Sequence, residues 1–192
     1  MNDHRYVPYA EDIGKAYREN QSAIVDAFQK AGVRVVIGSP GTISSVPSWV
    51  KSAQGTWEDL NESLCRLRNI DIEVAEAFGA GFADVYWPML QATFAAEKQF
   101  GTDFDVSGDD GVHPGWAGQV IMASAFLDAL GVDGRIGTLT VDLAAGKAVA
   151  DEGHVVRSFA DGKLEVTSSR WPFCTGSGPL DRDDSMRAGM AL

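Results

Sequence analysis

Apolar residues recur at helical spacing in four segments of the chain. The first segment spans residues 11–31, and its apolar positions are Ile13, Tyr17, Ile24, Ala27, Phe28 and Ala31. Gly32 follows directly and suits a helix end in the left-handed conformation. Similar stripes predict further helices over 56–79, 88–100 and 115–130. The chain therefore contains enough amphipathic helix to cover a sheet.

Local signals mark the starts of two of these helices. Thr56 and Asp59 have the spacing of an N-terminal capping box. In this motif, the side chain of each residue accepts a hydrogen bond from the backbone N–H of the other. These two residues are expected to open a second long helix, with a break near Asn69 as the alternative. Pro88 suits the first position of a helix, where its missing N–H costs nothing, so the third helix is expected to begin there.

Two short apolar runs lie between the helices. Residues 33–37 are mostly β-branched, and residues 82–87 combine aromatic and apolar side chains. Continuous apolar runs of this length are typical of strands buried on both faces. Repeated strand-then-helix units predict an α/β fold, a partial three-layer α/β/α unit with a parallel sheet.

The pattern changes after residue 133. Strands are expected over 138–143, 155–159 and 164–167, and Asp161-Gly162 is a strong signal for a two-residue hairpin turn. These features indicate a small antiparallel β region rather than a continuation of the α/β unit.

We therefore predict two domains, with an α/β domain over 1–132 and a β-rich appendage over 133–192. The tail from Thr175 is polar and rich in turn residues. It ends without a closing signal, so the appendage is expected to be incomplete.

Composition narrows the range of partners. The chain has 192 residues, of which 45% are hydrophobic, so it can bury a core of ordinary size. Acidic residues outnumber basic ones 27 to 16, and the net charge of -11 disfavours binding to nucleic acid and to anionic membranes. No stretch approaches the roughly 20 apolar residues that span a bilayer, and residues 1–5 lack the apolar core of a signal peptide. Localisation stays unknown from these residues.

The two cysteines, together with His4 and His154, do not indicate a metal site or a disulfide framework. Cys65 and Cys174 match neither a Cys-x-x-Cys site nor a dense disulfide framework, so two buried thiols are expected, with one disulfide as the alternative. His4 and His154 lack metal-ligand spacing and are expected on the surface. No metal or cofactor is implied.

An acidic loop precedes the fourth helix. Residues 103–108 begin like a calcium loop, but Pro114 stands where the bidentate Glu should be. A solvated acidic loop is therefore expected in place of a calcium site.

The same loop contains Asp110-Gly111-Val112-His113-Pro114, which places an acid and an imidazole three positions apart at a helix entrance. An Asp that orients a His forms two thirds of a nucleophilic hydrolase triad, in which the His takes the proton of an attacking Ser. The alternative from spacing alone is a surface loop whose acid caps the following helix.

This motif, followed by a helix that contains Gly118, resembles the last conserved block of the SGNH hydrolases, also called GDSL-type esterases and lipases. Met1-Asn2-Asp3 looks like the end of that family's Gly-x-Asn-Asp block. The two blocks stand in the family's order, and the resemblance covers residues 1–132.

The resemblance implies a role for three residues. His113 would be the general base, Asp110 its orienting partner and Asn2 a donor to the oxyanion. The substrate would be a small-molecule or carbohydrate ester, with a carbohydrate acetyl group as one example, and no cofactor is implied. A full-length parent of this kind would be expected to be secreted or periplasmic.

The family's nucleophilic Ser and second oxyanion block would lie upstream of Met1, so we expect this chain to be a fragment of the hydrolase. Ser39 is a poor replacement, because no Gly-x-Ser-x-Gly elbow is present and Pro40 lacks a backbone N–H. The strand over 33–38 would then have an exposed edge that favours self-association. A non-catalytic binding or structural protein on the same scaffold, and one subunit of a two-chain esterase, are the alternatives.

Overall fold

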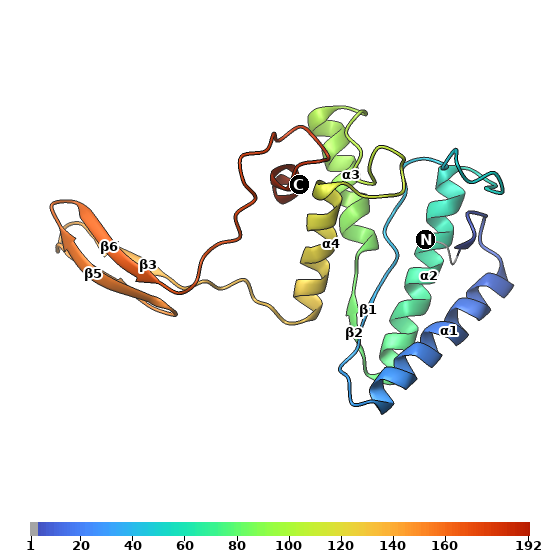
Figure 1. Ribbon diagram of the computed structural model, residues 1–192, viewed down its shortest axis with the longest axis horizontal. Helices are drawn as coiled ribbons and strands as arrows, with labels where there is room; N and C mark the ends of the chain where they lie inside the picture. Colours follow the sequence, from blue (N-terminus) through green and yellow to red (C-terminus); the bar gives the residue numbers. More distant parts are fainter. Residues whose placement is uncertain (1–3) are drawn as a thin grey trace. The chain divides into compact units, whose positions relative to one another are not determined.

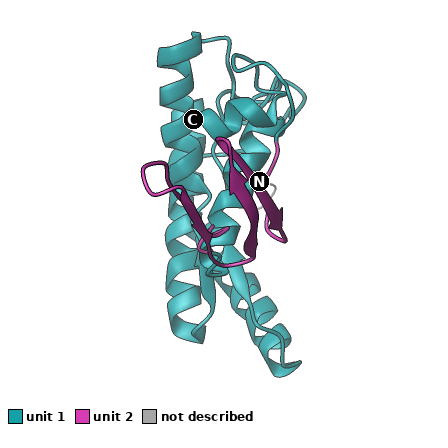
Figure 2. Cartoon of the chain, turned by 90° about the vertical axis from the view of Figure 1, so that its left-hand side faces the viewer, with its two compact units in different colours: residues 1–132, 175–192 teal, residues 133–174 magenta. Residues whose placement is uncertain are grey.

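A computed structural model describes residues 4–192 and divides the chain into two compact units (Figure 2). The first unit contains the residues up to 132 together with residues 175–192, and the second unit contains residues 133–174. The protein is a mixed α/β structure. In the described residues, no helix is both long and apolar enough to cross a membrane.

Helices make up most of the first unit. Its elements are α1 (Glu11–Lys30), β1 (Val36–Gly38), α2 (Trp57–Phe78), β2 (Gly81–Ala83), α3 (Tyr86–Phe100), α4 (Trp116–Ala129) and α5 (Met186–Ala191). The capping box predicted at Thr56 and Asp59 is present, and the left-handed Gly79 ends the same helix. The helix is continuous, as in the prediction of one long helix, and the alternative of a break near Asn69 is wrong.

Strands β1 and β2 pair in parallel, and Ile37 lies opposite Phe82. In Figure 1, α1 and α2 lie to the right of this pair, α4 lies to its left, and α3 lies above it. Residues of α1 and α2 pack with Ile37 in one core cluster, and α3 and α4 share a second cluster around Met89. Helix α4 comes so close to β1 that a methyl group added to Gly38 would lie 2.3 Å from the Phe126 ring. The described part of this sheet has two strands.

The strand predicted over 82–87 is wrong in its second half. β2 ends at Ala83, and α3 begins two residues before Pro88. The cause is a distant side chain, because Ser39 Oγ accepts hydrogen bonds from the backbone N–H groups of Val85 at 2.9 Å and Tyr86 at 3.0 Å. These are the orphan donors of the first helical turn, which need a partner when they are buried.

The second unit consists of two antiparallel hairpins, with β3 (Leu139–Asp142) paired to β4 (Lys147–Ala150) and β5 (His154–Ala160) paired to β6 (Lys163–Ser168). Asp161 and Gly162 both have positive φ, at 53° and 70°, which is the predicted two-residue turn. The sequence did not indicate β4. No residue of 133–174 is buried in this unit.

The prediction that residues 133–192 form one appendage needs correction, because residues 175–192 belong to the first unit. The segment ends in the short helix α5, in which Ala188 is fully buried. A methyl group added to Gly189 would lie 2.4 Å from the carbonyl oxygen of Ala117. Two small residues thus allow α5 to approach the start of α4, and a polar, turn-rich sequence gives no local sign of this packing.

Candidate active site

Asp110 and His113 lie on the loop that joins α3 to α4 and make a direct hydrogen bond. The Asp110 Oδ2 to His113 Nδ1 distance is 2.6 Å. The other oxygen, Oδ1, accepts the backbone N–H groups of Val112 at 3.0 Å and of His113 at 2.9 Å. The Asp110 carboxylate therefore fixes both the backbone turn over residues 110–113 and the imidazole ring of His113. The structure thus brings together the acid and the imidazole that the sequence pattern paired.

The electrostatics of the pair define which ring nitrogen carries hydrogen. The hydrogen bond from His113 is the largest cause that lowers the pKa of Asp110 from 3.8 to about 2, and the two backbone N–H groups lower it further. The carboxylate is thus ionised at neutral pH and can only accept, so Nδ1 of His113 must donate. In a neutral imidazole this leaves Nε2 as a proton acceptor, which is the state that a general base requires.

Short contacts with the segment after β1 hold this loop in place. The backbone N–H of Ser44 donates to the carbonyl of Gly111 at 3.0 Å, and Ser107 Oγ donates to the carbonyl of Thr42 at 3.0 Å. Gly111 has φ of 74°, and a methyl group added there would lie 2.1 Å from Ser45 Oγ. Both the backbone conformation and the close approach require glycine between the acid and the base.

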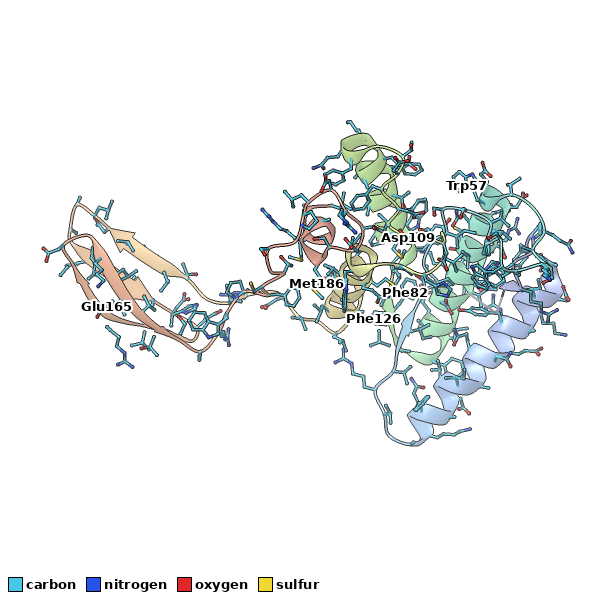
Figure 3. All side chains as sticks on the ribbon, turned by 45° about the horizontal axis from the view of Figure 1, so that its top comes forward. Trp57, Phe82, Asp109, Phe126, Glu165 and Met186 are labelled. Carbon is cyan, nitrogen blue, oxygen red and sulfur yellow. The ribbon has the colours of Figure 1, made fainter. Side chains whose placement is uncertain are left out.

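The C-terminal segment holds the other end of the loop. The carbonyl of Asp183 accepts the backbone N–H of Ala117 at 2.8 Å, so residue 183 satisfies a donor in the first turn of α4. Burial raises the pKa of the Asp183 carboxyl, and the charge of Asp109 raises it further. Asp109, which is labelled in Figure 3, immediately precedes Asp110. The loop is thus held between residues that are distant in the sequence.

An aromatic row leads from the core to His113. The rings of Trp49 and His113 stack with centroids 5.6 Å apart and planes at 24°. Tyr6 meets Trp49 edge to face at 5.8 Å, and His4 lies 4.9 Å from Tyr6. Burial and then the charge of Asp110 raise the pKa of Tyr6. No local pattern distinguishes Trp49 from the other four tryptophans of the chain.

Four other residues that the sequence analysis considered are Asn2, Ser39, His4 and His154. Asn2 lies outside the described residues. Ser39 is buried as the cap of α3, and its own hydroxyl donates to the carbonyl of Pro40 at 3.1 Å. His4 was expected on the surface but is fully buried, whereas His154 is half-buried with Nδ1 2.8 Å from Ser168 Oγ.

The cysteines also differ from the prediction. Both thiols are free, Cys65 is half-buried and Cys174 is exposed, so the expectation of two buried thiols is wrong. Within the described residues, no group of three or more His, Cys, Asp or Glu side chains is arranged to hold a metal ion.

A separate groove of about 850 Å³ runs along α3 and α4 beside the C-terminal residues. Phe82, Pro88, Ile121 and Met190 give it apolar walls, and Asp84 and Asp128 lie at its sides. Asp84 is already paired with Arg68, whose Nε donates at 2.9 Å. Asp110 and His113 do not line this groove.

Comparison with known proteins gives a likeness of fold. No family model matches the chain, and no curated protein matches it. A solved structure of a gut microbial diltiazem-metabolizing enzyme superimposes with a TM-score of 0.73 at 20% sequence identity. The match covers 100% of this chain and 46% of that one, so the chain spans less than half the length of the solved protein. At this identity the likeness concerns the fold.

Proposed function

We propose that these residues form the part of an SGNH-type serine ester hydrolase that carries the general base and its orienting acid. The observation that supports this most directly is the 2.6 Å hydrogen bond between Asp110 and His113, with Nε2 left to accept a proton. The resemblance of residues 110–114 to the family's last block supports it independently. The fold likeness is to an enzyme, which agrees with a catalytic role.

In the proposed reaction, His113 Nε2 removes the proton from a serine hydroxyl as that oxygen attacks the ester carbonyl. The ionised Asp110 stabilises the imidazolium that forms. His113 then gives the proton to the departing alkoxide, which leaves an acyl-enzyme. Water attacks this intermediate with the same base, and the acid product and free serine are released.

The serine in this proposal comes from polypeptide outside the 192 residues. Within the described residues, no hydroxyl donates to His113 Nε2. Ser39 caps α3, Ser44 Oγ is hydrogen bonded to Asp105, and Ser107 donates to the Thr42 carbonyl. A preceding segment of one polypeptide and a separate subunit would supply the serine equally well. Asn2 would donate to the oxyanion in the assembled site.

The test compares the 192-residue chain with the same chain joined to the coding sequence that precedes it. Each protein is treated with a fluorophosphonate, and its intact mass and its hydrolysis of p-nitrophenyl acetate are measured. We expect the 192-residue chain to stay unlabelled and the longer protein to be labelled on an added serine. His113→Gln is expected to lower the kcat of the longer protein by about 10⁴ or more, as loss of a triad base does elsewhere.

The other outcomes are equally informative. A stoichiometric adduct on the 192-residue chain would place the nucleophile inside it and contradict the missing-serine proposal. If neither protein reacts, addition of a cell extract shows whether a separate polypeptide supplies the labelled serine. Absence of labelling and hydrolysis in all three preparations would favour a non-catalytic protein on this scaffold.

A further inference from the structure

The imidazole of His113 is held by few contacts for a proposed catalytic base. Its side chain is 71% exposed, and its hydrogen bond to Asp110 fixes only Nδ1. A single hydrogen bond still allows the ring to rock about that atom, which would move Nε2 away from a substrate. A second contact is therefore needed to fix the plane of the ring, because productive proton transfer requires defined geometry.

Trp49 supplies a contact of this kind. Its ring lies nearly parallel to the imidazole, at 24° and 5.6 Å between centroids. This separation is within the range at which an aromatic face attracts a cation, so the stack also favours the imidazolium that forms when His113 takes a proton. The contact therefore acts on both the orientation and the charged state of the ring.

The position of Trp49 is itself fixed by a ring contact with Tyr6 and by a hydrogen-bonded turn of the backbone. Tyr6, which is buried, meets its ring edge to face at 5.8 Å. Pro47 is fully buried, and its carbonyl accepts the backbone N–H of Val50 at 3.2 Å, which closes a turn around Trp49. The hydrogen bond from Ser44 to Gly111 joins this segment to the His113 loop. Trp49 is thus a supported side chain, although 51% of its surface is exposed.

We propose that Trp49 is a positioning residue for the general base, which stacks on His113 so that Nε2 faces the substrate and the imidazolium is stabilised. The catalytic meaning of this role depends on the proposed hydrolase function, whereas the physical contact does not. Because Trp49 lies largely at the surface, its replacement leaves no internal cavity. The effect of a substitution can therefore be assigned to His113 without a general loss of stability.

The first experiment uses the 192-residue chain with isotope-labelled histidine and follows His113 by NMR in Trp49→Ala, Trp49→Phe and Trp57→Ala. Trp57, labelled in Figure 3 at the start of α2, is a comparably exposed tryptophan and serves as the control. In Trp49→Ala we expect the ring protons of His113 to lose their upfield ring-current shift. The Nδ1 hydrogen should exchange about two- to fivefold faster, as expected from loss of about 0.5–1 kcal/mol of ring contact.

Trp49→Phe should retain most of both effects, and Trp57→Ala should leave them unchanged. A persisting pKa of about 2 for Asp110 in each variant would show that the loop is still folded. If Trp49→Ala leaves the His113 signals as they are in Trp57→Ala, the positioning role is overturned.

A second readout separates this inference from the proposed function. The second readout uses the longer protein, in which the chain is joined to the preceding coding sequence. There, Trp49→Ala should lower kcat several-fold with little change in KM, and Trp49→Phe should retain most of the activity. A normal kcat in Trp49→Ala would overturn the positioning role in an active hydrolase. If that protein hydrolyses no ester although the NMR contact is present, the proposed function fails and the stacking of Trp49 on His113 stands.

Discussion

Asp110 binds His113 through both of its carboxylate oxygens, because Oδ2 accepts from the ring Nδ1 at 2.6 Å and Oδ1 accepts from the backbone N–H at 2.9 Å. The same side chain thus sets the backbone turn and the tautomer of the imidazole. Because the two contacts come from one rigid group, any change in the turn also changes the orientation of the ring.

Removal of the imidazole should raise the pKa of Asp110. In His113→Ala we expect the pKa to rise from about 2 towards 3.8 but to stay below it, because the backbone N–H groups of residues 112 and 113 still donate. The measurement is a carboxyl ¹³C titration. Trp57→Ala is the control and should leave the pKa at about 2. An unchanged value in His113→Ala would mean that the backbone donors alone cause the shift.

The stability contributed by Asp110 should depend on pH with a defined sign. Its pKa in the folded protein lies below its ordinary value of 3.8, so its contribution is complete above that pH and is lost as pH falls through about 2. Because the pair is solvent-exposed, we expect Asp110→Asn to lower the free energy of unfolding by less than about 1 kcal/mol at pH 7. Urea denaturation of both proteins should show the difference shrinking as the pH is lowered. A difference that grows on acidification would contradict this assignment.

Gly111 should be far less replaceable than a glycine of the same conformation in open space. Its φ is 74°, and an added methyl group would lie 2.1 Å from Ser45 Oγ and 2.9 Å from Ser45 N. Gly131 has φ of 79° with nothing within 4 Å of that position. We expect Gly131→Ala to cost about 1–2 kcal/mol from backbone conformation alone and Gly111→Ala to cost at least about 1 kcal/mol more from overpacking. Equal losses in urea denaturation would show that the loop relaxes freely.

Asp183 should destabilise the protein at neutral pH through its side chain. Burial and the charge of Asp109 raise its pKa, so the folded state is penalised above that pKa and the penalty disappears in acid. Asp183→Asn should therefore raise the melting temperature at pH 7 and have no such benefit at low pH. Its carbonyl still binds Ala117. As a control, Asp26→Asn loses the exposed ion pair with Lys30 and should not raise the melting temperature.

In residues 4–192, β1 pairs on one edge alone, and we expect its other edge to promote self-association. Val35 and Ser39 bond to the β2 segment, and Ile37 lies between them in the same alternation, so the N–H and C=O groups of Val36 and Gly38 face away from β2. A strand edge of this kind pairs with other chains. Sedimentation velocity should show concentration-dependent association that Val33→Lys weakens, while Val132→Lys, at a similarly exposed valine, should not. A monomer at every concentration would exclude this edge as an interface.

Local sequence signals predicted the elements whose ends depend on neighbouring residues. The capping box at Thr56, the turn at Asp161-Gly162 and the hydrogen bond between Asp110 and His113 each involve residues at most a few positions apart. Their physics is contained in a short segment, so spacing was sufficient to find them.

Features that depend on distant residues could not be predicted in this way. Ser39 caps a helix that begins 47 positions later, and this contact shortened the predicted strand after residue 83. Burial of His4 and stacking of Trp49 on His113 likewise result from how separate loops meet. The site was therefore predicted as an acid and a base, and the residues that support it were found only in the folded chain.

The hydrogen bond from Ala117 to Asp183 and the packing of Gly189 on α4 also define an order of events during synthesis. A ribosome releases the His113 loop and α4 well before residues 183–189, and domains generally fold as their sequence emerges. The backbone N–H groups in the first turn of α4 therefore bind water until residues 183–189 pack against this turn and displace the water. The proposed base and acid are therefore held on both sides only after residues 183–189 have left the ribosome. In a nascent chain stalled within the β hairpins, the backbone N–H of Ala117 would lack the Asp183 carbonyl as its partner.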